Sequence, residues 1–210
     1  MAQYFSIHPT HPQARLVRRA AEIVRGGGLI AYPTDSCYAL GCHLGDARAV
    51  ARLRRVRHMD ARHHLTLMCR DLSEIAAYAI VDDARYRLLK RVTPGSYTFI
   101  LRATREVPRR LAHPRRKTIG LRVPAHAVAH ALLAELDEPM LSATLLLPGE
   151  AAPPTDAAAI RSRLEHEVDL VIDAGSCGVE PTTVLDLTGD EAVVLRAGKG
   201  SLAPFSVESV

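Results

Sequence analysis

Two segments carry polar side chains at the end of an apolar stretch or within one. A ligand could reach such side chains where a strand ends. Thr34 and Asp35 follow the apolar residues 29–32 and a proline. They could face a ligand, or they could serve the turn itself, since Asp and Ser after Pro favour turns. Arg122 lies inside the apolar stretch 118–123. A buried arginine needs a partner, so we expect Arg122 to meet a carboxylate or a phosphate.

Two further segments carry the same kind of chemistry. Ser142 and Thr144 are two residues apart in an apolar strand, so their hydroxyls share one face. They could bind a phosphate or satisfy neighbouring backbone groups. Arg196 closes another apolar segment. Together, these groups predict an anion-binding cleft.

Common catalytic signatures are absent from the sequence. It contains no GxxxxGK[ST], no GxGxxG after a strand, no GxSxG and no HExxH. The histidines at positions 58, 63 and 64 and the cysteines at 37 and 42 have poor spacing for a metal site. We therefore expect no permanently bound metal, and we interpret the four cysteines as reduced thiols of a cytoplasmic protein.

Alternating helical and strand patterns predict an α/β protein with a mixed sheet. Helices are predicted at 13–25, 46–57, 72–78, 82–92, 126–136 and 156–167, and strands at 29–32, 65–69, 97–102, 118–123, 140–147, 170–173, 183–187 and 192–196. We expect an N-terminal extension at 1–12, one domain at 13–200 and a short tail at 201–210. No apolar stretch approaches the ~20 residues that a membrane helix needs, so no membrane partner is expected.

Basic residues are concentrated in two segments. Residues 102–122 contain eight Lys or Arg against one acid, and residues 48–62 contain six Arg against one acid. Such clusters indicate an anionic partner, either a polyphosphate or RNA, or else a solvated basic face. For RNA, the candidates are Arg109, Arg110, Arg115, Arg116 and Lys117.

Five segments, in order, resemble motifs of the YrdC/YciO family. They are 32–41 (YPTDSCYALG, compared with PTDTVYGLG), 93–98 (TPGSYT, compared with WPGPLT), 118–124 (TIGLRVP, compared with TVGVRVP), 181–186 (PTTVLD, compared with PSTVVD) and 195–198 (LRAG, compared with IRxG). The chain looks like the YciO-like branch of this family.

The resemblance implies a single-domain twisted mixed sheet with flanking helices around a positively charged cavity. It also implies a chemistry. Relatives combine L-threonine, bicarbonate and ATP into L-threonylcarbamoyl-adenylate and pyrophosphate, and the adenylate feeds N6-threonylcarbamoyladenosine (t6A) formation in tRNA. Mg²⁺ accompanies ATP as substrate. Proteins of the t6A pathway and tRNA or double-stranded RNA are the implied partners.

The resemblance also assigns roles to residues. Thr34 and Tyr38 would line the threonine side of the cavity, and Arg57 and Arg122 would hold carboxylate and phosphate groups. The nucleotide would contact Ser142, Thr144, Thr182 and Arg196, with Arg57, Arg122 and Thr144 as the catalytic set.

Two synthase motifs are altered in this sequence, and each loses a hydrogen-bond donor. In the motif KxRP, the lysine corresponds to Arg57 and the arginine to Met59; in the motif SxN, the asparagine corresponds to Leu146. Each lost donor could cost roughly 3 kcal/mol of transition-state stabilisation. Three functions therefore remain open: a nucleotidyltransferase with weakened activity, a protein that binds double-stranded RNA or tRNA, and a nucleotide sensor without turnover.

Overall fold

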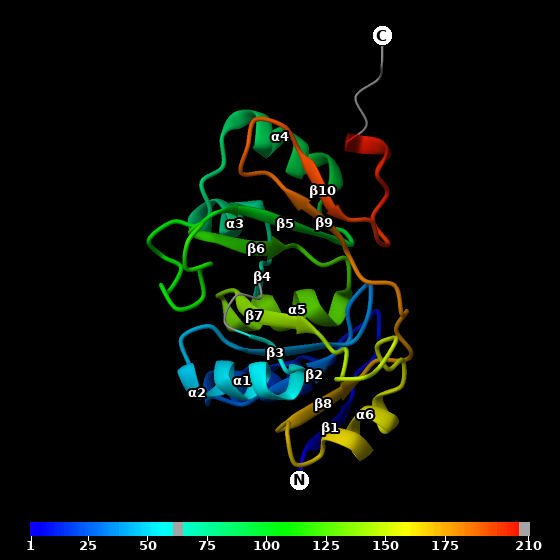
Figure 1. The fold of residues 1–210 in the computed structure, drawn as a ribbon. Helices are drawn as coiled ribbons and strands as arrows, with labels where there is room; N and C mark the ends of the chain where they lie inside the picture. The colour runs from blue at the N-terminus through cyan, green and yellow to red at the C-terminus, as the bar shows by residue number, and fades with distance from the viewer. Residues whose placement is uncertain (61–64, 206–210) are drawn as a thin grey trace.

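One twisted mixed sheet forms the centre of the molecule (Figure 1). The computed structural model describes residues 1–60 and 65–205. Within them, ten strands pair in the order β1-β8-β2-β3-β7-β4-β6-β5-β9-β10. The strands are β1 (Gln3–Ser6), β2 (Ile30–Tyr32), β3 (Ala39–His43), β4 (Thr66–Met68), β5 (Tyr97–Arg102), β6 (Thr118–Arg122), β7 (Met140–Thr144), β8 (Leu170–Asp173), β9 (Thr183–Asp186) and β10 (Val193–Arg196).

Helices cover both faces of the sheet. They are α1 (Ala14–Arg25), α2 (Ala47–Arg57), α3 (Leu72–Tyr78), α4 (Asp83–Val92), α5 (Ala127–Leu136) and α6 (Ala157–Leu164), followed by a short 3-10 turn at Ala203–Phe205. An aspartate caps the start of α2, α3, α4 and α6, where its carboxylate accepts backbone N–H bonds. Such a cap stabilises a helix by about 1 kcal/mol. The single-domain mixed α/β fold predicted from the sequence is confirmed.

The apolar core is divided between the two faces of the sheet. In the smaller cluster, α1 and α5 pack on strand residues such as Ile30, Tyr32 and Met140. In the larger cluster, residues of the other four helices pack with Leu40, Leu141 and the alternate residues of the same strands. Side chains of a strand alternate between faces. On the face that carries α1 and α5, these helices do not cover the whole sheet. The cavity described below lies on the uncovered part of this face.

Two strands were not predicted from the sequence. The strand β1 pairs in parallel with β8, so residues 3–6 of the expected N-terminal extension belong to the sheet. The strand β3 pairs in antiparallel fashion with both β2 and β7. Its sequence, ALGCH, has no polar alternation, because both faces are covered.

Candidate functional site

A cavity of about 580 Å³ opens on one face of the sheet. The pairing register explains its floor, since paired residues on neighbouring strands point to the same face. Thr66 on β4 pairs with Ser142 on β7, and Thr98 on β5 pairs with Val184 on β9. All four residues line the cavity. Short strands from distant parts of the sequence thus bring hydroxyl groups into one hollow.

The rim of the cavity adds charge and apolar surface. Arg57 at the end of α2 and Arg196 at the end of β10 both line it, and no described acidic side chain does. Met59 and Leu146 line it as well. The two positions at which a synthase donor is replaced by an apolar side chain therefore face this cavity.

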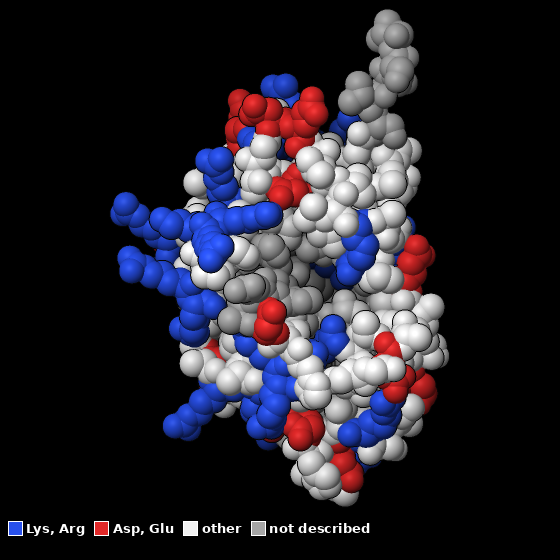
Figure 2. Space-filling view, in the orientation of Figure 1, with Lys and Arg blue, Asp and Glu red and all other residues white. Residues whose placement is uncertain are grey.

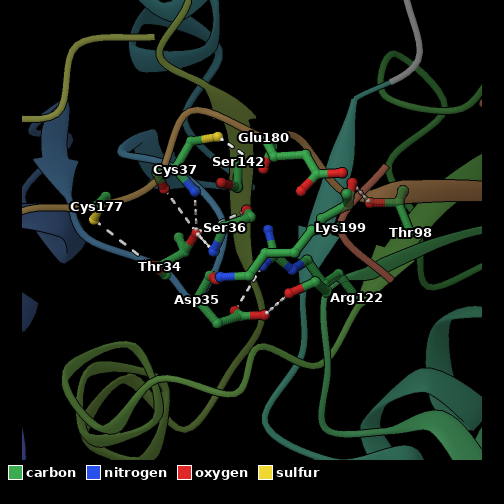
Figure 3. Close-up of polar contacts among 12 residues, drawn as sticks. Thr34, Asp35, Ser36, Cys37, Thr98, Arg122, Ser142, Cys177, Glu180 and Lys199 are labelled. Carbon is green, nitrogen blue, oxygen red and sulfur yellow. Dashed lines mark hydrogen bonds and ion pairs between the residues drawn. The ribbon is translucent and has the colours of Figure 1, made fainter. Parts of the chain in front are cut away.

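A narrow recess of about 30 Å³ shares part of this lining and extends toward β6. Arg122 lies in its wall and is 6% exposed. Its Nη2 donates to Asp35 Oδ1 at 2.6 Å, and Ser96 Oγ donates to Asp35 Oδ2 at 2.6 Å. Lys199 Nζ donates to the backbone oxygen of Asp35. Figure 3 shows Asp35, Arg122 and Lys199 pointing toward one another. Arg122 therefore meets a carboxylate, one of the two partners expected for it.

The environment of Asp35 keeps its carboxylate charged. Burial favours the neutral acid, but Arg122 and the hydrogen bonds from Ser96 and the backbone outweigh it, so the pKa of Asp35 lies below its ordinary value. The Nε of Arg122 has no hydrogen-bond partner among the described residues. A buried N–H without an acceptor is costly, so the Nε of Arg122 can donate a hydrogen bond to a ligand oxygen at the recess.

Thr34 forms the turn that leads into the recess. Its Oγ1 donates to the backbone oxygen of Cys37 at 2.7 Å and accepts the backbone N–H groups of Ser36 and Cys37. The hydroxyl therefore supports the turn, which was the alternative weighed from the sequence. Thr34 still lines the recess, where its side chain contributes shape.

The other predicted hydroxyls lie on the cavity floor, but protein groups already contact most of them. Ser142 Oγ donates to the backbone oxygen of Leu40 at 3.2 Å and lies 2.7 Å from Tyr32 Oη. Thr182 Oγ1 lies 2.9 Å from Thr98 Oγ1. The Arg196 Nε and Nη2 donate to the backbone oxygen of Thr182. Thr144 lines both the cavity and the recess, as the two-residue spacing from Ser142 predicted.

Arg57 differs from these groups because its charge is not matched. No described residue forms an ion pair or hydrogen bond with its side chain, and its Nε is buried. Burial lowers the pKa of the guanidinium. Arg57 is thus the cavity cation best placed to gain from an anionic ligand.

Comparisons with known proteins identify the family. A family model described as "Telomere recombination", for Sua5, YciO and YrdC, matches residues 22–198. This chain belongs to the Sua5/YciO/YrdC family. It is 55% identical over 205 residues to the uncharacterized protein YciO of Escherichia coli K12, which covers 98% of this chain and all of that one. The crystal structure of E. coli YciO superposes with a TM-score of 0.95 at 54% identity, over 98% of this chain and all of that one.

Synthases of the same family are more distant. The threonylcarbamoyl-AMP synthase of Chromobacterium violaceum is 35% identical over 180 residues, which are 85% of this chain and 92% of the synthase. The Sua5 protein of Pyrococcus abyssi, solved in complex with L-threonine, has a TM-score of 0.85 at 27% identity. The match covers 93% of this chain and 57% of that protein. This chain is therefore similar to both branches, and much more so to YciO.

Tyr38, which the family resemblance assigned to the threonine side, does not line the cavity or the recess. It is fully buried, and its hydroxyl donates to the backbone oxygen of Gly175 at 2.8 Å. The cavity face of β3 belongs to Ala39 and Gly41, which pair with Thr144 and Ser142. Tyr38 therefore has the opposite orientation, and it packs in the larger apolar cluster.

The residues predicted for RNA lie apart from the cavity, on the connection between β5 and β6. Figure 2 shows Lys and Arg side chains projecting from this side of the molecule. All five residues are exposed, namely Arg109, Arg110, Arg115, Arg116 and Lys117. Arg110 differs from the other four because its Nη2 donates to the backbone oxygens of Leu44 and Gly45.

Some of the residues around the site were missed from the sequence. Thr66 and Thr98 line both the cavity and the recess, and each is a polar residue in an otherwise apolar strand, which was an available signal. Lys199 gave no such signal, since 164 positions separate it from Asp35. Of the three histidines considered for metal binding, His63 and His64 lie outside the described residues. Among the described residues, no three His, Cys, Asp or Glu side chains form a group that could hold a metal, and no helix is long and apolar enough to cross a membrane.

Proposed function

We propose that this protein binds ATP in the cavity and makes L-threonylcarbamoyl-adenylate from L-threonine, bicarbonate and ATP, with slow turnover. One observation carries the proposal. An unmatched arginine, Arg57, and a row of hydroxyl groups line a hollow that narrows into a recess ending at Arg122. This arrangement suits a ligand with a phosphate at one end and a small polar group at the other.

Each part of the site has a role in this reaction. Arg57 and Arg196 hold the phosphates of ATP, with which Mg²⁺ enters. The recess, with the free Nε of Arg122 and the Thr34 turn, takes the carboxylate and hydroxyl of threonine. Threonine as the substrate, though not its position in the recess, is supported by the Sua5 relative that was solved with L-threonine. No nucleophilic side chain is required. The threonine amine and bicarbonate form a carbamate with loss of water, and the carbamate oxygen then attacks the α-phosphate of ATP so that pyrophosphate leaves.

Slow turnover follows from the two apolar side chains at the rim. Developing negative charge on the transferred phosphate needs donors, and Met59 and Leu146 offer none. Loss of two donors slows such a reaction by up to ~10⁴-fold if the effects add, which neighbouring sites often do not.

The test is pyrophosphate release from ATP by the purified protein, with L-threonine and bicarbonate omitted in turn. We expect slow release that requires all three substrates. The variant Met59→Arg/Leu146→Asn should raise the rate by about a hundredfold, since each restored donor contributes to the transition state. A matched control is Val179→Arg/Leu195→Asn, which places the same groups elsewhere on the rim. Binding of ATP without release, in both the wild-type protein and the restored variant, would identify a nucleotide sensor.

A second function is RNA binding by the exposed basic residues between β5 and β6. Arg109, Arg115, Arg116 and Lys117 are exposed, and none forms an ion pair among the described residues. Contacts of this kind are made to phosphates, so affinity should fall steeply as salt rises. An affinity for double-stranded RNA or tRNA that does not change with salt concentration would rule this function out.

A further inference from the structure

A second cavity, the basic hollow, lies at the far end of β5 and has a volume of about 470 Å³. Its lining consists of Ile80, Arg102, Ala103, Arg116, Lys117, Thr118 and Thr188. Thr98 and Ile100 line the main cavity, and Arg102 continues the same alternation along β5. The basic hollow therefore lies on the same face of the sheet, and four residues of strand set Thr98 and Arg102 about 13 Å apart.

Positive charge dominates the basic hollow. Arg102, Arg116 and Lys117 are all exposed, and none forms an ion pair among the described residues. No acidic side chain lines the hollow. Asp186 lies next to the wall residue Thr188. The hydroxyl and the backbone N–H of Thr188 both donate to Asp186 Oδ1. Three like charges around one hollow repel one another, so an anion held between them would be stabilised.

The wall of the basic hollow also has an apolar side. Ile80 is 61% exposed and lies among the three cations that line the hollow. The backbone holds it in place, since Ile80 N–H donates to the Arg102 oxygen at 2.9 Å and Ala79 forms a β-bridge with Ala103. A ligand that fits both sides combines a phosphate with a flat or apolar group.

We propose that the basic hollow binds a nucleoside phosphate unit, with the phosphate between Arg102, Arg116 and Lys117 and the heterocycle against Ile80. The unit can come from a free nucleotide or from an RNA strand. For an RNA strand, this proposal rests on the second function proposed above, because Arg116 and Lys117 belong to both. It is independent of the chemistry in the main cavity, because the two hollows share no lining residue. Pyrophosphate release therefore tests one proposal, and binding at the basic hollow tests the other.

The experiment compares two double variants that remove the same charge. Arg116→Gln/Lys117→Gln alters the basic hollow, whereas Arg87→Gln/Lys90→Gln alters two exposed residues of α4 that do not line it. Glutamine keeps the side-chain stem and removes the cation. AMP is titrated by calorimetry to count sites, and a labelled single-stranded hexaribonucleotide is titrated at several salt concentrations. Circular dichroism checks that both variants are folded.

Each result supports or overturns the proposal. Loss of one AMP site in the hollow variant alone, whatever the number of sites in the wild-type protein, identifies a free nucleotide as the ligand. An unchanged AMP stoichiometry, with RNA affinity reduced about tenfold and the salt slope reduced by about 1.4, identifies an RNA strand. Equal binding by the hollow and control variants in both titrations overturns the proposal. A third variant, Ile80→Ser, should weaken the same binding without changing the salt slope, because it removes apolar contact and no charge.

Discussion

The recess and the basic hollow both contain arginines, but their charges are arranged in opposite ways. In the recess, Arg122 is buried and its guanidinium is paired with Asp35, which Ser96 also holds. In the basic hollow, Arg102, Arg116 and Lys117 are exposed, and no described acid pairs with them. The first region has the pattern of a structural ion pair. The second has the pattern of an anion-binding surface, because its cations have no protein partner.

Solvation explains this difference. A buried cation loses its hydration, so the fold must supply a counter-charge and hydrogen bonds at the same place. An exposed cation remains hydrated, so it can stay unpaired at little cost and is screened by salt. We therefore expect substitutions in the recess to change stability, and substitutions around the basic hollow to change binding.

The largest effect should come from Asp35→Asn. It removes the counter-charge of a buried arginine and leaves Arg122 charged and uncompensated, which should lower the free energy of unfolding by about 3 kcal/mol. Urea denaturation at pH 7 measures it. The control is Glu150→Gln, which breaks the exposed pair with Arg163 and should change stability by less than about 1 kcal/mol. Equal losses in the two variants would mean that burial of the Arg122 pair has no special role.

The same pair predicts a dependence on pH. The pKa of Asp35 is lowered in the folded protein, so its contribution is fully present above the unfolded-state pKa of about 3.9 and is lost as pH falls through the lower folded-state value. The stability difference between wild type and Asp35→Asn should therefore be constant near neutral pH and shrink below about pH 4. Denaturation midpoints at pH 7, 5, 4 and 3 test this. A difference that grows on acidification would contradict the lowered pKa.

Patterns among residues close in the sequence predicted several features of the recess and of the elements around it. Strand periodicity placed Ser142 and Thr144 on one face, and the rarity of unpaired buried arginine predicted a partner for Arg122. Helical periodicity predicted a helix at 46–57, and α2 runs from Ala47 to Arg57. These predictions succeeded because each depends on neighbours in the chain.

Other features depend on contacts that no local pattern encodes. The strand β3 was missed because both of its faces are buried, so its sequence has no alternation. Tyr38 was assigned to the site by resemblance, but the register of β3 gives the cavity face to its neighbours. The basic hollow could not be predicted either, because Ile80 and Thr188 meet β5 only in the folded sheet. Long-range pairing, which sequence spacing does not reveal, decides these features.

A moderate effect is expected in the main cavity. Arg57→Ala should weaken ATP binding about tenfold, since it removes the one described cavity cation without a protein partner. It should not destabilise the fold, because no ion pair is broken. Calorimetric titration measures the affinity. The matched control is Arg55→Ala on the same helix, which pairs with Glu167 outside the cavity and should leave ATP affinity unchanged. Similar affinities for both variants would remove Arg57 from the nucleotide site.

The smallest effect is expected for Arg109→Gln/Arg115→Gln. Both side chains are exposed and form no ion pair among the described residues, so the free energy of unfolding should change by less than about 0.5 kcal/mol. Neither residue lines the basic hollow, so RNA affinity should fall less than in Arg116→Gln/Lys117→Gln. Urea denaturation and the same hexaribonucleotide titration measure the two quantities. If this variant weakened RNA binding as much as the hollow variant, binding would follow total surface charge. A larger loss of RNA affinity in the hollow variant would instead mean that RNA binding depends on charges at the basic hollow and not on the total surface charge.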